Sequence, residues 1–318
     1  MQNIILATRG SDLALTQTRM VAQALRNAHD GIEVEELIIK TSGDIRQDLK
    51  LSEFAKGENP VVDKGIFTKE LEVALVEKRA HAAVHSLKDV PTLLDETFCI
   101  AAVLPRAPVS DVALLKPNGP ATLAELPHGA KVATSSVRRQ CFLKSLYPHL
   151  EFTEIRGNVP TRIRKLIEQD FQAILLASAG LARLYGDSFL QNHRLTFEGK
   201  DLPVEILDPQ VFLPAASQGA VAIEVLSGNP TVKDLISTIN DHPTFRQITA
   251  ERAFLDALSA GCDTPVGALS QINPDGTLRL KVAVFENNHS TTPLRAEGTC
   301  AEGEEMDLGQ RLFHELSA

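Results

Sequence analysis

The chain has 318 residues, of which 43% are hydrophobic and 23% are charged, and its formal net charge is −9. This length exceeds what one ordinary core supports, so we expect two or three domains. The acidic balance argues against a nucleic-acid partner, because such binders usually carry an excess of positive charge. No run of about 18 apolar residues is present, so we expect no membrane span.

The N-terminus and the cysteines indicate the compartment. The opening stretch MQNIILATRG enters strand-like sequence at once and lacks the long apolar run of a signal peptide. The cysteines are scattered and form no C-x-x-C pair, which disfavours a zinc site or a disulfide framework. We therefore expect a cytoplasmic protein without a bound metal.

The first two-thirds of the chain alternates short apolar runs with amphipathic stretches. Strands are expected at 4–8, 34–40, 81–86, 111–115, 131–135, 151–155 and 172–178, with helices at 11–29, 68–79, 136–147 and 159–169. Strands that alternate with helices predict parallel sheets covered on both faces. We expect two α/β domains, with a seam near the proline-rich stretch 104–111.

The last eighty or so residues have a different pattern. A helix is expected at 244–259, and the NPDGT stretch at 273–277 predicts a hairpin turn between two strands. A further strand at 294–301 and a helix at 308–316 complete a small α+β domain. Cys262 stands just after the first of these helices, and as a lone cysteine it is by default an incidental thiol.

Two polar segments interrupt the α/β pattern and are expected to be surface insertions. They span residues 45–63 and 186–210. The first is long enough to act as a mobile lid.

Two arginines occupy an unfavourable position at a predicted helix start. Arg138 and Arg139 fall in the first turn, after Ser135 or Ser136 as the N-cap. Cations there oppose the helix dipole at a cost of about 0.3–1 kcal/mol each. An anion is therefore expected nearby. If that anion is a ligand, replacing either arginine by leucine should cost little stability.

The same placement recurs along the chain. Arg9, Arg156 and Arg183 also lie where a strand gives way to a helix, and Arg162 lies in the helix that follows Arg156. In doubly wound sheets these ends line the ligand crevice, and guanidinium groups there suit carboxylates or phosphates. Because neither glycine-rich nucleotide motif is present, a ligand with several carboxylates is favoured over a nucleotide.

An acid and a lysine follow the third predicted strand, on the same rim. Asp89 can accept a hydrogen bond from a cationic or N–H-bearing ligand, and Lys88 can keep it ionised. A turn-forming role before Pro91 explains Asp89 equally well from local sequence. Phe67, just before the second helix, is by default a core residue.

The assembled motifs resemble the hydroxymethylbilane synthase family, also called the porphobilinogen deaminase family. They are ATRGSDLAL, KGIFTKELEVAL, AVHSLKDVP, ATSSVRRQ, RGNVPTR, PAASQGAV, TAERAFL and AGCDTPVG, all in the order of the family. The resemblance covers nearly the whole chain. It implies a transferase of porphyrin and heme biosynthesis that joins four porphobilinogen molecules head to tail, with loss of ammonia, and releases hydroxymethylbilane by hydrolysis.

The resemblance also implies roles for individual residues. Cys262 would carry a covalent dipyrromethane cofactor, which primes the growing tetrapyrrole, and Asp89 would be the catalytic carboxylate. Each pyrrole bears two carboxylates, so the growing chain is the polyanion that the arginines suit. The residues matched to cofactor and substrate binding are Arg9, Ser11, Lys88, Arg138, Arg139, Arg156, Arg162 and Arg183, with weaker matches at Gln17, Lys64, Phe67, Thr134, Ser135, Ser136 and Gln218.

The fold implied is two doubly wound domains like those of periplasmic binding proteins, followed by a small α+β domain. The expected limits are residues 1–106 with about 219–240, residues 107–218, and residues 241–318. Porphobilinogen is the expected partner of a monomeric protein. The chain departs from the family pattern at Asp12, Val62-Asp63, Pro160 and Ala260, which concerns loop geometry rather than the reacting groups.

Two other functions remain open from the residues alone. A solute-binding module would explain the crevice arginines, but not Asp89 or the third domain with Cys262. A different transferase acting on polycarboxylates is the weaker alternative. Intact-protein mass separates them, because only the synthase carries an adduct of two pyrrole units.

Overall fold

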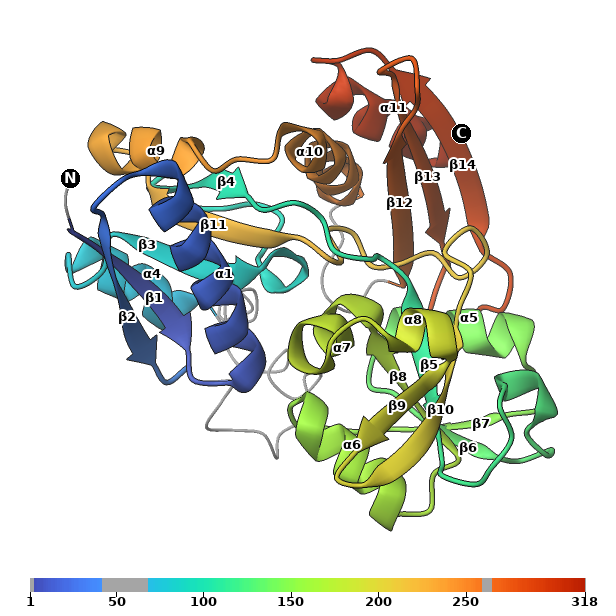
Figure 1. Cartoon of the computed structure of the whole chain (residues 1–318). Helices are drawn as coiled ribbons and strands as arrows, with labels where there is room; N and C mark the ends of the chain where they lie inside the picture. Colours follow the sequence, from blue (N-terminus) through green and yellow to red (C-terminus); the bar gives the residue numbers. More distant parts are fainter. Residues whose placement is uncertain (1–2, 42–67, 259–264, 318) are drawn as a thin grey trace, which may run out of the picture.

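The computed structural model describes residues 3–41, 68–258 and 265–317, arranged around three β-sheets (Figure 1). The predicted lid at 45–63 lies outside the described residues, as do Lys64, Phe67 and Cys262. None of the helices in the described part of the chain is long and apolar enough to cross a membrane.

The first sheet has five strands and is mixed. Its order is β2 (Glu33–Ile39), β1 (Asn3–Arg9), β3 (Ala82–Ser86), β11 (Val221–Leu226) and β4 (Phe98–Val103). The first three are parallel, and β11 is antiparallel to both of its neighbours. Helices α1 (Asp12–Ala28) and α9 (Pro230–Ser237) bury their apolar sides on one face, and α4 (Lys69–Val76) covers the other. This region is therefore a three-layer α/β unit.

The second sheet has six strands. Its order is β7 (Glu151–Thr153), β6 (Lys131–Ala133), β8 (Ala173–Ala177), β5 (Asp111–Leu115), β10 (Lys200–Ile206) and β9 (Arg194–Phe197). Helix α5 (Val137–Leu146) packs on one face, and α6 (Val159–Glu168), α7 (Ser178–Tyr185) and α8 (Phe189–Asn192) pack on the other. Here too the strands are mixed, because β5 is antiparallel to β8.

The expectation that residues 186–210 form a surface insertion is wrong. This segment provides α8, β9 and β10, and its side chains Phe189, Leu195, Phe197 and Leu202 are buried in the core of the second sheet. The alternation of apolar and polar residues in LTFEGKDLPV is a strand pattern, which the high polar content obscured.

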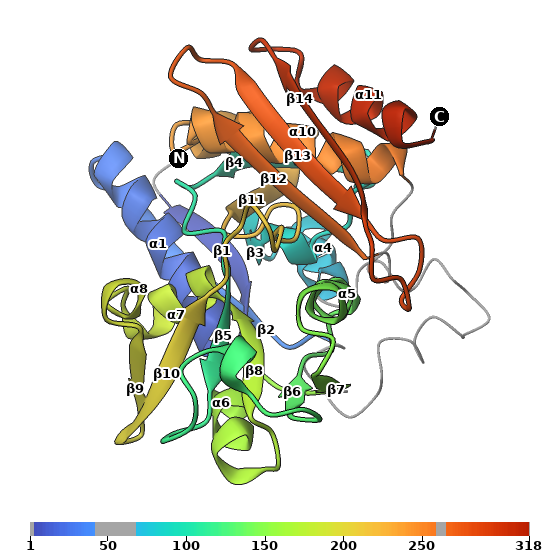
Figure 2. The same ribbon diagram turned by 90° about the vertical axis from the view of Figure 1, so that its right-hand side faces the viewer.

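The third sheet is an antiparallel meander of β12 (Val266–Ile272), β13 (Leu278–Val284) and β14 (Leu294–Cys300). The predicted hairpin turn is confirmed, since Asn273 N donates to Thr277 O over 2.8 Å. Helices α10 (His242–Ala257) and α11 (Glu305–Ser317) bury Phe254 and Leu308 with the strands. In Figure 2, both helices lie behind this sheet as the viewer faces it.

The chain passes between the first two sheets twice. It leaves after β4 and returns to β11, which inserts between β3 and β4. The two crossing segments, residues 104–107 and 217–220, run side by side, and Ala107 N donates to Gly219 O over 3.2 Å. Gly219 has a φ of +89°, and a Cβ there would lie 2.4 Å from Ala107 O, so only glycine fits. The strand order agrees with the expected domain limits, which themselves stay a prediction.

Candidate active site

Asp89 lies at the carboxyl end of β3, in the 3₁₀ helix η2 (Leu87–Asp89). A pocket at this edge of the first sheet is lined by Asp89 together with Arg9, Ser11 and Gln17. Ser11 caps α1 by accepting from Ala14 N over 3.3 Å. The structure thus brings four of the predicted site residues to one pocket, because parallel strands deliver their carboxyl ends to the same edge.

The inner wall of this pocket contains polar side chains that are already paired. Gln17 is buried and its Nε2 atom lies 2.8 Å from Ser86 Oγ, which fixes the amide against β3. His85 also lines the pocket, and its Nε2 atom lies 3.0 Å from Oε2 of the buried Glu224 on β11. This buried contact with Glu224 indicates a structural role for His85.

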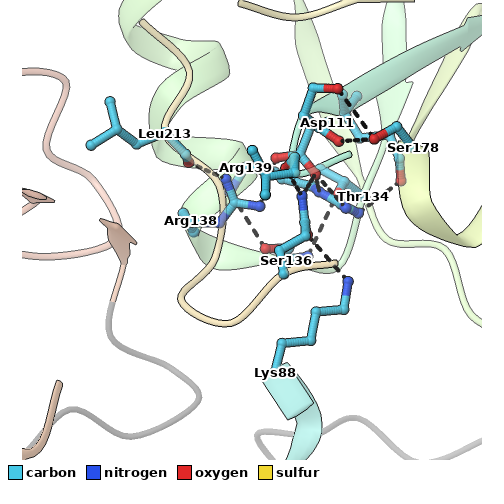
Figure 3. A network of polar contacts seen from close by, with 12 residues as sticks. Lys88, Asp111, Thr134, Ser136, Arg138, Arg139, Ser178 and Leu213 are labelled. Carbon is cyan, nitrogen blue, oxygen red and sulfur yellow. Dashed lines mark hydrogen bonds and ion pairs between the residues drawn. The ribbon is translucent and has the colours of Figure 1, made fainter. Parts of the chain in front are cut away.

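Lys88 reaches from the first sheet toward the second (Figure 3). Its Nζ atom donates to Oε1 of the buried Gln218 over 3.2 Å. The Lys88 residue as a whole is exposed, but the protein around its ammonium group displaces enough water to lower the pKa of Lys88 to about 8. The charge of Asp89 opposes this shift, and the charge of Arg139 adds to it. Lys88 therefore loses its charge at a lower pH than an ordinary lysine does.

Gln218 links Lys88 to a buried carboxylate of the second sheet. Its Nε2 atom donates to Val109 O over 2.8 Å and to Asp111 Oδ1 over 3.1 Å. Asp111 is fully buried at the start of β5. A continuous chain of hydrogen bonds therefore runs from the ammonium group of Lys88 to the interior of the neighbouring sheet (Figure 3).

Arg138 and Arg139 share Asp111 as their counter-ion. Arg138 Nη2 lies 2.7 Å from Oδ2, and Arg139 donates to Oδ1 from Nη2 over 2.7 Å and from Nε over 3.1 Å. The remaining Nη1 atoms donate to the carbonyl groups of Leu213 and Leu175. Burial alone would raise the pKa of Asp111, but the two guanidinium groups hold it well below its usual range.

These contacts correct the expectation about stability. Both arginines are 6% exposed, so they are core residues that neutralise a buried acid rather than exposed cations that oppose a helix dipole. The sequence argument required an anion near the start of α5, and the structure provides Asp111. Whether a ligand carboxylate also reaches these arginines stays a prediction.

Three further predicted arginines lie on the second-sheet region, and two of them keep a buried nitrogen without a partner among the described residues. Arg162 Nε donates to Gly157 O over 2.7 Å, and Arg183 Nη2 donates to Gly219 O over 2.6 Å. Among the described residues, the buried Nε atoms of Arg156 and Arg183 have no hydrogen-bond partner. Loss of water lowers the pKa of Arg162 to about 10; Arg139 and Arg156 add to the shift and Asp89 opposes it. The charge of Asp89 therefore acts on Arg162.

The hydroxyl groups before α5 are engaged in local structure. Ser136 is the N-cap and accepts from Arg139 N over 3.4 Å, while Thr134 Oγ1 accepts from Ser136 N over 3.3 Å. Ser135 Oγ donates to Ile155 O over 2.7 Å and accepts from Ile155 N over 3.1 Å. These three residues thus shape the loop above β6, and their predicted contact with ligand stays a prediction.

Sequence reasoning missed several residues that organise this site. Nothing in the local sequence indicated that Asp111 is buried, because aspartate is mostly exposed in folded proteins. Arg106 and Glu251 form a buried two-point ion pair, with contacts of 2.8 and 2.9 Å, between a crossing segment and α10. No local pattern pairs residues 145 positions apart.

The family of the chain follows from comparison with known sequences. Residues 4–234 match the family model described as "Porphobilinogen deaminase, dipyromethane cofactor binding domain", and residues 245–318 match the one described as "Porphobilinogen deaminase, C-terminal domain". The chain belongs to the porphobilinogen deaminase family. The sequence resemblance is thereby confirmed.

Curated relatives agree over the full length. The porphobilinogen deaminase of Maridesulfovibrio salexigens is 39% identical over 319 residues, covering 100% of this chain and 96% of the relative. That of Gloeobacter violaceus is 40% identical over 322 residues, covering 100% and 91%. Among solved structures, the methionine-binding protein MetQ is 12% identical with a TM-score of 0.44, covering 77% of this chain and 93% of its own. The BenM effector-binding domain is 16% identical with a TM-score of 0.43, covering 78% and 92%.

Family membership gives the activity. The protein is a transferase of tetrapyrrole biosynthesis that polymerises porphobilinogen and uses a dipyrromethane cofactor. The site fits such a cofactor chemically, since a dipyrromethane carries several carboxylates. Buried guanidinium nitrogens of Arg156 and Arg183 that lack partners among the described residues are the donors such carboxylates need.

Proposed function

We propose that Asp89 is the catalytic carboxylate of this transferase and that Cys262 is the attachment residue of the cofactor. The observation that carries the proposal is the pocket at the end of β3, where Asp89 meets Arg9, Ser11 and Gln17. A single acid among ligand-binding groups is what a reaction through a cationic pyrrole needs. Cys262 rests on its place in the AGCDTPVG motif of the family.

In this proposal Asp89 stabilises the cationic intermediate and transfers protons. In each addition, the aminomethyl group of porphobilinogen reacts in its ammonium form: the C–N bond breaks, neutral ammonia leaves, and the remaining methylene-pyrrole is a cation. The Asp89 carboxylate accepts a hydrogen bond from the pyrrole N–H and stabilises that cation. The new C–C bond forms at the free α-carbon of the chain being extended, and the proton displaced from that carbon passes to Asp89 and then to the released ammonia, which becomes ammonium.

The cations of the site hold the carboxylate groups of the pyrroles. When bound, the dipyrromethane supplies the free pyrrole α-carbon to which the first porphobilinogen is joined. We assign ligand binding to polar and cationic side chains of the pocket and of the neighbouring second-sheet region, with Lys64 and Phe67 assigned from their motif alone. The first group comprises Arg9, Ser11, Gln17, Lys88, Arg156, Arg162 and Arg183.

Arg138 and Arg139 receive a different role in this proposal. Arg139 already uses all three of its guanidinium nitrogens on Asp111 and on Leu175 O, so a ligand would have to displace a buried carboxylate. We infer that both arginines act mainly by fixing Asp111, which orients Gln218 and through it Lys88. Thr134, Ser135 and Ser136 support the same loop.

Further aspects of the proposal come from the family and from composition. We infer that the protein works as a monomer in the cytoplasm, that it binds no nucleic acid, and that its three domains have the limits given above. The solute-binding alternative is set aside because the chain belongs to the porphobilinogen deaminase family.

The test combines intact-protein mass with two variants. The wild-type protein should carry an adduct of two pyrrole units, which Cys262→Ser abolishes; an adduct on Cys99, Cys141 or Cys300 would overturn the assignment. Asp89→Asn keeps shape but removes charge, so turnover should fall about 10²–10³-fold. Asp89→Glu keeps the charge about one methylene away and should retain weak activity. A turn-forming Asp89 predicts the reverse order, with Asn nearly normal.

A further inference from the structure

The loop that follows Asp89 is held by Arg252 of helix α10, which packs on the third sheet. Arg252 on α10 donates from Nη1 to Val90 O over 3.3 Å, and from Nη2 to Pro91 O over 2.5 Å and to Thr92 O over 2.8 Å. One guanidinium group thus binds three consecutive carbonyl groups. These belong to the three residues immediately after Asp89.

The guanidinium group suits this task because of its shape and its surroundings. Its planar fork directs several N–H groups at fixed angles, whereas an ammonium group is a single point donor. Arg252 is half-buried, and loss of water lowers its pKa to about 10, against the charges of Asp256 and Glu224. No acid neutralises the guanidinium by direct contact among the described residues, so the carbonyl groups of the loop are its main partners.

The helix that carries Arg252 is itself fixed to the crossing segments. The neighbouring residue, Glu251, is fully buried and accepts from Arg106 Nη1 and Nη2 over 2.8 and 2.9 Å. It also accepts from Ser217 N over 2.6 Å and from Ser270 Oγ over 2.6 Å. Helix α10 lies between β4 and β12 in Figure 1. It therefore contacts the crossing segments through Glu251 and the Asp89 loop through Arg252.

We propose that Arg252 is a positioning residue for Asp89, so that the third-sheet region sets the place of the catalytic carboxylate in the first-sheet region. The proposal rests on the catalytic role assigned to Asp89. Asp89 is exposed and ends a single 3₁₀ turn, so its own helix constrains it weakly. Rates depend on the placement of reacting groups on a scale of about 1 Å. Three hydrogen bonds to the next three carbonyl groups limit such displacement.

Two variants of Arg252 and one matched control separate positioning from general stability. Arg252→Met keeps the apolar stem and removes all three hydrogen bonds. Arg252→Lys keeps the charge but cannot span three carbonyl groups. Arg246→Lys is the control, because Arg246 is buried on the same helix and bonds within the third-sheet region, to Glu305 Oε1 over 2.5 Å and to Gly276 O over 3.0 Å.

The expected results are specific to the Asp89 loop. Arg252→Met should lower kcat about 10–100-fold with KM for porphobilinogen changed less than about threefold, and Arg252→Lys should lie between Arg252→Met and the wild type. Amide hydrogen exchange in residues 89–93 should accelerate in both variants. Arg246→Lys should reduce Tm without either effect. Intact mass verifies that each variant retains its two-pyrrole adduct.

A double variant decides whether Arg252 acts through Asp89. If it does, Asp89→Asn/Arg252→Met should turn over no more slowly than Asp89→Asn alone, because the positioned charge is already absent. Multiplicative losses in the double variant, or normal kcat in Arg252→Met, would overturn the inference while leaving the role of Asp89 intact. Near-normal turnover of Asp89→Asn alone would instead remove the proposed function, and this inference with it.

Discussion

Arg138 and Asp111 form an ion pair of 2.7 Å in the interior, with 6% of the arginine side chain exposed and none of the carboxylate. Arg139 completes a triad around the same carboxylate, with a contact of 2.7 Å. In a buried cluster of one acid and two arginines, losing the acid and losing one arginine have different consequences. Loss of one arginine leaves a pair, whereas loss of the acid leaves two buried cations side by side.

This asymmetry predicts an order of stability among variants. Asp111→Asn should lower the free energy of unfolding by about 3–5 kcal/mol, because it leaves uncompensated buried charge. Arg138→Leu should cost less, about 1–3 kcal/mol, since Asp111 keeps Arg139 and only one charged hydrogen bond to it is lost. Urea unfolding of the two proteins gives the comparison. Equal stability of Asp111→Asn and wild type would refute the triad as a stabilising unit.

The triad also determines how the protein responds to acid. The pKa of Asp111 is held below its unfolded value, so its contribution is fully present above about pH 4 and is lost as pH falls further. The wild-type protein should therefore lose more stability between pH 5 and pH 2 than Asp111→Asn does. These pH limits follow from the ordinary pKa of an aspartate, about 3.9.

The lowered pKa of Lys88 predicts that substrate binding weakens at alkaline pH. Its pKa is lowered to about 8, so the free protein loses this ammonium charge as pH rises through that value. A carboxylate ligand binds the charged form, so kcat/KM should decline above about pH 8 if Lys88 binds substrate. In Lys88→Arg the cation persists at that pH, and the decline should move to higher pH. An unchanged profile in this variant would remove Lys88 from substrate binding.

The sequence predicted local features well because they depend on neighbouring residues. A cap at Ser135 or Ser136 and a turn at 273–277 each follow from short patterns, and the structure has the cap at Ser136 and the turn. The grouping of Arg9 with Asp89 also followed, since both stand at the carboxyl ends of parallel strands.

Features that depend on distant pairing could not be predicted in this way. Strand β11 inserts between β3 and β4 because the chain crosses between the first two sheets twice. The sequence of a strand does not show which other strand it will pair with. The partner of Arg138 on helix α5 lies 27 residues away on strand β5, so the argument from the helix dipole found the need for an anion but not its identity. Arg252 contacts the Asp89 loop across about half the chain, over 160–162 positions.

Arg183 offers a test of the carboxylate-binding role apart from the fold. Its Nη2 atom donates to Gly219 O over 2.6 Å, while its buried Nε atom has no partner within the described residues. Arg183→Met should therefore cost only about 1 kcal/mol of stability in the protein without ligand, the value of one hydrogen bond. If a ligand carboxylate binds the guanidinium, the lost charged hydrogen bond, about 1.5–3 kcal/mol, should raise KM for porphobilinogen about 10–150-fold.

The matched control for Arg183 is an arginine of the same sheet region with an exposed partner. Arg164 lies on α6 and pairs with Glu198 over 2.7 Å, with about half of each side chain in solvent. Arg164→Met should leave KM unchanged, because an exposed ion pair contributes little. Steady-state kinetics and intact mass on both variants decide the matter. A normal KM and a full two-pyrrole adduct in Arg183→Met would show that its unpaired nitrogen serves no ligand, and the carboxylates would then have to be held by Arg156 and Arg162.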